Sequence, residues 1–148
     1  MNVMKPYIIG FYGESNTGKT TLIVELINRL SSEGFNVASV KKSDKKVSID
    51  SEGKDTWKHA SAGSKLVVFS TDLETDFLLK QKMDGNELVS IINHFGTYDI
   101  IIIEGASCEE IPKIRLGKIK ERNNTIITYD NDFEKLIEFI KNQIVRGN

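Results

Sequence analysis

The stretch that decides the fold is Gly13-Glu14-Ser15-Asn16-Thr17-Gly18-Lys19-Thr20. It fits the pattern G-x-x-x-x-G-K-[ST] at every fixed position, and this pattern is typical of a loop that holds nucleotide phosphates. The glycines let the backbone bend closely, so that successive N–H groups can point at phosphate oxygens. In such a loop Lys19 reaches the β- and γ-phosphates and the Thr20 hydroxyl ligates Mg²⁺. We therefore predict that the loop and Thr21 bind a nucleotide.

The residues on either side of this stretch supply the context that the loop requires. Residues 7–12 form a short apolar run, which is typical of a buried strand. Residues 20–30 place Leu22, Leu26 and Leu30 four apart, which predicts a helix with one apolar stripe. A strand, a glycine loop and a helix then follow one another, and the helix offers its N-terminus to an anion.

A second acidic group for the site is expected at the end of a neighbouring strand. Residues 100–103 are four consecutive isoleucines, the signature of a strand buried on both faces of a parallel sheet. Glu104 follows them directly, whereas Asp99 stands at the opposite end, away from the ligand edge. We predict that Glu104 supports Mg²⁺ or orients water, directly or through a water molecule. The alternative is a solvated carboxylate at a strand end.

The remaining pattern alternates strands with helices. Asp84 and Glu87 have the spacing of a capping box before a helix over 84–95, and Asn131 opens a last helix. Further strands are predicted at 35–40, 65–70, 77–79 and 125–128, and a short helix at 55–62 that Asp55 caps. This order indicates an α/β fold with a mostly parallel sheet and helices on both faces. No linker or repeat interrupts it, so residues 1–148 are predicted to form a single domain.

Composition excludes several classes of protein. The chain has 148 residues, 20 basic and 21 acidic side chains and a net charge of −1, which argues against a nucleic-acid partner. Cys108 is the single cysteine, so no disulfide framework or zinc ribbon forms, and a lone thiol suggests no redox chemistry. No apolar run approaches the ~20 residues that span a bilayer. No signal peptide is recognised either, and we expect a cytoplasmic protein without a membrane partner.

Three separated segments carry a resemblance to a known family. The first is the phosphate loop with its flanks, residues 10–22. The second, residues 50–63, follows the pattern D-x-x-G-K-D-[ST]-x-[KR]-H-x-x-A-G, and the third is Glu104-Gly105 followed by Pro112-Lys113-Ile114. On these segments the chain resembles the molybdopterin-guanine dinucleotide biosynthesis protein B family, a set of small P-loop proteins.

The resemblance implies a P-loop NTPase fold and a GTP-binding accessory protein with weak GTPase activity, which uses Mg²⁺. The implied partner is the guanylyltransferase that attaches GMP to molybdopterin, and members are usually homodimers. The implied site comprises Lys19 and Glu104 for catalysis, Thr20 and Glu104 for the metal, and residues 13–21 for GTP. Lys54 and Asp55, in the loop over 41–63, are implied to help hold a molybdopterin-type ligand.

The chain departs from the family pattern at three places. The family usually shows histidines where this chain has Lys42 and its neighbours, Phe-Lys where it has Ala106-Ser107, and an acidic residue where it has Arg115. A divergent, archaeal-like member of the family or a paralogue with a shifted substrate would show these departures.

Two other functions stay open from the residues alone. One is a P-loop kinase of a small metabolite, and the other is a nucleotide-sensing adaptor without relevant turnover. A kinase of this fold usually carries an arginine-rich lid, whereas this chain has only Arg29, Arg115, Arg122 and Arg146. No Asn-Lys-x-Asp motif is present to read guanine, so the residues do not distinguish GTP from ATP.

Overall fold

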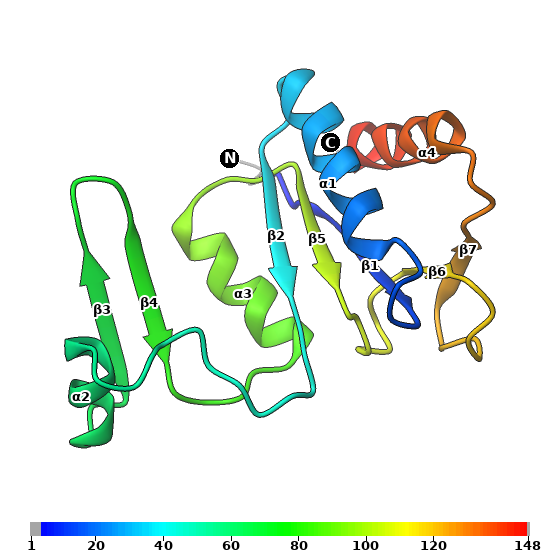
Figure 1. Cartoon of the computed structure of the whole chain (residues 1–148). Coiled ribbons are helices and arrows are strands. Elements are labelled where there is room, and N and C mark those ends of the chain that lie inside the picture. The colour runs from blue at the N-terminus through cyan, green and yellow to red at the C-terminus, as the bar shows by residue number, and fades with distance from the viewer. Residues whose placement is uncertain (1–3, 148) are drawn as a thin grey trace. The chain divides into compact units, whose positions relative to one another are not determined.

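The computed structural model describes residues 4–147, whose contacts gather into two compact units (Figure 1). The core unit comprises the chain up to Ser43 together with the chain from Asp84 onward. The hairpin unit comprises Asp44–Met83. In sequence, therefore, the hairpin unit interrupts the core unit once.

The core unit is built on a five-stranded sheet with the strand order β2-β5-β1-β6-β7. All four pairings in this sheet are parallel, which confirms the predicted α/β fold. The strands are β1 (Tyr7–Gly13), β2 (Val37–Lys41), β5 (Ile100–Glu104), β6 (Lys113–Leu116) and β7 (Thr125–Thr128). Because the strands are parallel, their carboxyl ends meet at one edge of the sheet, where ligands bind in folds of this kind.

Helices cover both faces of this sheet, as predicted. Helices α1 (Lys19–Ser32) and α4 (Phe133–Arg146) pack on one face, and α3 (Gly85–Phe95) packs on the other (Figure 1). The isoleucines of β5 alternate between the two cores: Ile100 and Ile102 lie in the first and Ile101 and Ile103 in the second. All four are at most 1% exposed, so β5 is the buried strand that their sequence predicts. No helix within residues 4–147 is long and apolar enough to cross a membrane.

The hairpin unit contains one short helix and two strands. Helix α2 (Asp55–Ser61) packs against β3 (Leu66–Ser70), which pairs antiparallel with β4 (Thr75–Leu79). Strand β4 begins two residues before the predicted 77–79. Phe69 of β3 lies directly opposite Asp76 of β4 in the register. This unit has its own small sheet, separate from the parallel sheet of the core unit.

Strand β6 is the one strand of the core sheet that the sequence pattern did not predict. Its four residues alternate two cations with two apolar side chains, which is the pattern of a strand with one solvent-facing side, and the run is short for recognition. In the structure β6 lies between β1 and β7, and Lys113 is only 1% exposed. The Lys113 ammonium donates hydrogen bonds to the carbonyls of Ile111 (2.8 Å) and Asn123 (2.9 Å). These acceptors offset its burial, and a sequence pattern does not reveal them.

Two predicted helix starts are also wrong in detail. Asn131 does not open α4, because its backbone is left-handed (φ 67°), and Asp132 is the N-cap whose carboxylate accepts the Lys135 N–H at 3.1 Å. Asp55 does not cap α2, because it is the first helical residue and the N-cap position is taken by Lys54, with no side-chain hydrogen bond. The capping box of Asp84 and Glu87 is confirmed.

Candidate nucleotide-binding site

The loop between β1 and α1 owes its shape to two left-handed residues. Asn16 has φ 63° and Gly18 has φ 83°. A side chain with a Cβ is strained in this region of backbone conformation, and glycine is not. Gly18 is also the N-cap of α1, because its carbonyl accepts the Leu22 N–H at 2.9 Å. The loop therefore turns tightly and then starts the helix at Lys19, so the first N–H groups of α1 face the loop.

Side chains of the loop hold its first residues in place by hydrogen bonds to their carbonyls. The Lys19 ammonium donates to the carbonyls of Gly13 (2.8 Å) and Glu14 (2.7 Å). The Thr17 hydroxyl donates to the same Glu14 carbonyl at 2.8 Å. Lys19 thus folds back over the start of the loop as a cation with three donors, which can exchange these carbonyls for phosphate oxygens.

Glu104 joins the loop to two neighbouring strands. In the parallel register it lies beside Phe11 of β1 and Lys41 of β2. Its Oε1 accepts a hydrogen bond from the Thr20 hydroxyl at 2.7 Å and from the Lys41 ammonium at 3.0 Å. Glu104 is 8% exposed, so it is not the solvated strand-end carboxylate that the sequence left open. The structure brings Lys19, Thr20 and Glu104 to one edge of the sheet.

The surroundings of Glu104 favour its ionised form. Burial by itself raises the pKa of this carboxyl group, but the hydrogen bonds from Thr20 and Lys41, together with the positive charges of Lys41 and Lys19, outweigh burial. The pKa of Glu104 is therefore below its ordinary value of 4.5, and the side chain is a carboxylate at neutral pH. A hydroxyl beside a carboxylate is the hard oxygen donor set that Mg²⁺ prefers, so these residues fit that ion.

The chain after Glu104 is held in place by a glycine and an arginine. Gly105 has φ 83°, and a Cβ there would lie 2.5 Å from the Lys42 carbonyl oxygen. Its N–H donates to the Phe11 carbonyl at 2.9 Å, which continues the pairing with β1. The Arg122 guanidinium donates to the Ala106 carbonyl at 2.7 Å. These contacts explain why glycine follows Glu104 and keep the carboxylate aimed at Thr20.

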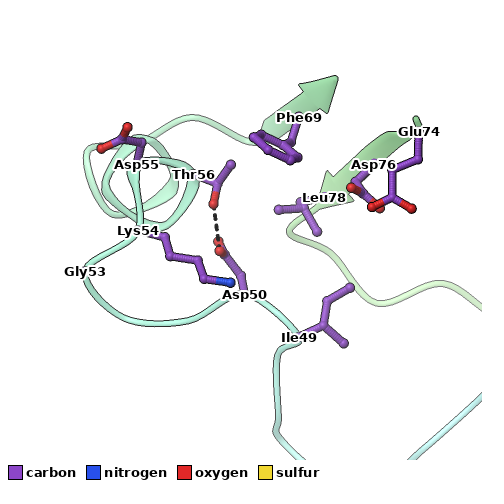
Figure 2. A pocket seen from close by; sticks show the side chains of 10 residues that line it. All are labelled: Ile49, Asp50, Gly53, Lys54, Asp55, Thr56, Phe69, Glu74, Asp76 and Leu78. Carbon is purple, nitrogen blue, oxygen red and sulfur yellow. Dashed lines mark hydrogen bonds between the residues drawn. The ribbon is translucent and has the colours of Figure 1, made fainter. Parts of the chain in front are cut away.

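Lys54 and Asp55 belong to the hairpin unit, where both line a cavity of about 590 Å³ (Figure 2). The Asp55 side chain is 94% exposed, with its Oδ1 3.7 Å from the Lys58 ammonium. The cavity is lined by Ile49, Asp50, Gly53, Lys54, Asp55, Thr56, Phe69, Glu74, Asp76 and Leu78. Lys54 and Asp55 thus line a cavity whose walls combine apolar, acidic and basic side chains.

Sequence reasoning missed two features of these sites. It did not predict that the Lys41 ammonium pairs with the Glu104 carboxylate. It also missed Phe69 and Asp76 as walls of the cavity. Alternation along β4 brings Asp76 and Leu78 to one side, but the partner across the hairpin depends on a register that the sequence does not display.

A parallel sheet with a glycine-rich loop between its central strand and the following helix defines a P-loop NTPase fold. A family model described as "Molybdopterin guanine dinucleotide synthesis protein B" matches residues 8–142. The chain belongs to this family.

Relatives and solved structures agree with this assignment. A Methanocaldococcus jannaschii protein is 30% identical over 131 residues, 88% of this chain and 51% of its own length. The "Molybdopterin-guanine dinucleotide biosynthesis adapter protein" of Haemophilus influenzae is 33% identical over 113 residues, 75% of this chain and 63% of its own. The chain therefore spans only about half to two thirds of the length of these relatives.

Two crystal structures show the same fold. Bacillus subtilis MobB superposes with a TM-score of 0.73 at 21% identity, covering 92% of this chain and 96% of that chain. The MobB homologue from Bacillus stearothermophilus gives a TM-score of 0.64 at 15% identity, covering 95% and 99%.

Proposed function

We propose that this chain is a GTP-binding accessory protein of molybdopterin-guanine dinucleotide biosynthesis that hydrolyses GTP slowly. The observation that carries the proposal is the 2.7 Å hydrogen bond between the Thr20 hydroxyl and the Glu104 carboxylate. It joins the glycine-rich loop to the neighbouring strand in a chain of the molybdopterin guanine dinucleotide synthesis protein B family. A hydroxyl and a carboxylate in this arrangement can ligate the Mg²⁺ ion of a bound nucleoside triphosphate.

Each residue of the site has a distinct task in this proposal. Backbone N–H groups of residues 13–21 bind the phosphates, and Lys19 places a positive charge beside the β- and γ-phosphates. Thr20 and Glu104 hold Mg²⁺, which neutralises charge on the phosphates when bound. Glu104 also orients the attacking water, and its lowered pKa keeps it an acceptor at neutral pH.

The choice of guanine and of the partner rests on the family. We propose that the protein assists the guanylyltransferase that joins GMP to molybdopterin, acting as a homodimer in the cytoplasm. The Haemophilus influenzae relative carries the name of an adapter protein of this biosynthesis, which supports an assisting role. Lys54 and Asp55 then contribute to holding the second, molybdopterin-type ligand.

The kinase alternative requires arginines that are able to close over phosphates. Arg29 instead donates to both carboxylate oxygens of Glu134, and Arg115 donates to the Thr128 hydroxyl. Arg122 donates to the Ala106 carbonyl and stacks 4.7 Å from the Tyr12 ring. Three of the four arginines therefore serve internal contacts, which favours an accessory protein over a kinase.

Nucleotide binding is tested by thermal unfolding with GTP, ATP and Mg²⁺. At a hundredfold excess over Kd, binding stabilises the folded state by about 2.7 kcal/mol. For a chain of this size, that free energy corresponds to a rise in Tm of roughly 5–10 °C. The rise should be largest with GTP and Mg²⁺, and Lys19→Ala should remove most of it while the variant folds normally.

Lys46→Ala is the matched control, because it removes an exposed lysine outside the phosphate loop. It should keep the full rise in Tm. An unchanged rise in Lys19→Ala would refute the phosphate site, and a rise with ATP alone would refute the choice of guanine.

A further inference from the structure

The cavity of the hairpin unit combines apolar side chains with both acidic and basic ones, and so differs in chemistry from the phosphate loop. Its volume of about 590 Å³ lies in the range of small-molecule sites. Ile49, Phe69 and Leu78 supply apolar surface, and polar groups stand around them (Figure 2). All the lining residues belong to the hairpin unit, so the cavity is complete within it.

Two of its carboxylates are already engaged. Asp50 is 2% exposed at its side chain and accepts the Thr56 hydroxyl at 2.8 Å, with the Lys80 ammonium 3.5 Å away. Asp55 is 94% exposed, and Figure 2 shows its carboxylate turned away from the other lining side chains. Neither carboxylate is therefore an open acceptor inside the cavity for the ring of a ligand. Asp50 instead holds the loop against the start of α2.

Three charged side chains of the lining have no such partner. Lys54, Glu74 and Asp76 make no side-chain hydrogen bond or ion pair with any residue among those that the structure describes. Lys54 points into the cavity from the loop before α2, and Glu74 and Asp76 stand on the side formed by β4 (Figure 2). The cavity therefore has an unpaired cation on one side and unpaired carboxylates on the other.

The hairpin register places an aromatic ring beside one of these carboxylates. Phe69 and Asp76 are directly opposite each other, so their side chains leave the same face of the hairpin. Leu78 lies two residues further along β4 and faces the same side. A flat ligand that packs on Phe69 and Leu78 brings its edge to the Asp76 carboxylate.

We propose that this cavity binds a planar heterocycle that carries an anionic group and the 2-amino-4-oxo pyrimidine edge shared by pterins and guanine. The adjacent N–H groups of that edge donate in parallel to the two oxygens of Asp76, as a guanidinium does to a carboxylate. The ring packs on Phe69 and Leu78, and the anionic group pairs with Lys54. This inference deepens the proposed function, on which the choice of a pterin over guanine rests.

Other ligand chemistries fit the cavity less well. A lysine or arginine side chain from a partner would pair with Asp76 but would leave the Lys54 ammonium facing another positive charge. A phosphate alone would pair with Lys54 but would face the carboxylates of Glu74 and Asp76. A ligand with donors at one end and an anion at the other satisfies both sides.

Binding is tested with pterin-6-carboxylate, followed by the fluorescence anisotropy of the pterin itself. Asp76→Asn should weaken binding by at least about tenfold, because an amide replaces one acceptor with a donor. Asp76→Glu should restore part of the affinity. Asp72→Asn is the matched control, because Asp72 lies in the hairpin turn outside the lining, and it should bind like the wild type.

A second ligand tests the contribution of the 2-amino group on the edge of the pterin ring. Lumazine-6-carboxylate has an oxo group in place of the 2-amino group and should bind at least about tenfold more weakly than the pterin. GMP carries the same edge on a guanine ring. If GMP bound at the Asp76 site more tightly than pterin-6-carboxylate, the natural ligand of the cavity would be a guanine nucleotide and not a pterin. Equal binding of pterin by wild type and Asp76→Asn, or no binding of either ring, would overturn the proposal.

Lys19→Ala separates this inference from the proposed function. It should lose the Tm rise with GTP and keep its affinity for pterin-6-carboxylate. If the wild type bound GTP but not pterin-6-carboxylate, only the cavity proposal would be overturned. Pterin binding without any GTP binding would overturn only the GTP-dependent function.

Discussion

Glu104 shows how one carboxylate joins three elements of the fold. It follows the buried isoleucines of β5, accepts from Thr20 at the start of α1 and pairs with Lys41 of β2. Glu104→Gln keeps the shape and removes the charge. We expect GTP turnover to fall far more than GTP affinity, because charge and water orientation act mainly on the transition state. Single-turnover hydrolysis and equilibrium binding measure the two effects, and a native rate in the variant would exclude Glu104 from catalysis.

The same residue predicts a pH dependence of stability. The pKa of Glu104 is lower in the folded state than its ordinary value of 4.5, so the ionised form stabilises the fold. This contribution is fully present above the ordinary value and is lost as the pH falls through the folded pKa. The difference in free energy of unfolding between wild type and Glu104→Gln should therefore narrow toward acid.

Urea denaturation between pH 7 and pH 3 measures this difference. Glu52→Gln, which removes one exposed carboxylate from the loop before α2, provides the control for the loss of a single negative charge. A difference between wild type and Glu104→Gln that stays constant down to pH 3 would contradict the linkage.

At the scale of elements, helix α3 depends on its capping box. The Asp84 carboxylate accepts the Glu87 N–H at 2.8 Å, and the Glu87 carboxylate accepts the Asp84 N–H at 2.8 Å. Asp84→Ala leaves an N–H at the helix start without its acceptor, which costs about 1 kcal/mol. For a chain of this length we expect Tm to fall by roughly 2–4 °C. Calorimetry measures the change, and an unaltered Tm would show that water replaces the cap at no cost.

The sequence predicts a helix or strand correctly where its local pattern matches the surroundings that the residues have in the fold. The isoleucines of β5 and the capping box of α3 need no knowledge of distant residues, and both were found. Strand β6 was missed because its buried Lys113 is satisfied by the carbonyls of Ile111 and Asn123, which only the folded loops bring near. The start of α4 was misplaced because Asn131 and Asp132 are both good caps, and the left-handed backbone at Asn131 decides between them.

At the scale of the whole chain, the two candidate sites differ in how far the sequence predicts them. The phosphate loop and Glu104 follow from topology, because parallel strands bring their carboxyl ends to one edge. The cavity depends on Phe69 meeting Asp76 across an antiparallel pair, and the register that pairs them is not set by a motif. The register of the hairpin, which decides which side chains face each other across it, is therefore what sequence reasoning lacked.

The accessory role that we propose would use both units of the same chain, and this gives the last prediction. Lys54→Ala with Asp55→Ala alters the hairpin unit and leaves the phosphate loop and Glu104 unchanged. The double variant should keep the Tm rise with GTP and should weaken the stimulation of guanylyl transfer by the partner enzyme. Lys54 should carry most of the loss, because it points into the cavity, whereas Asp55 is exposed and lies near Lys58.

A reconstituted guanylyl-transfer assay, titrated with wild type and variants, measures this effect. Lys46→Ala serves as the control for removing a lysine from the hairpin unit outside the cavity. Equal stimulation by wild type and the double variant would exclude Lys54 and Asp55 from the mechanism. Absence of stimulation by the wild type would point to a paralogue with another second substrate, consistent with the departures from the family pattern at Lys42, Ala106 and Arg115.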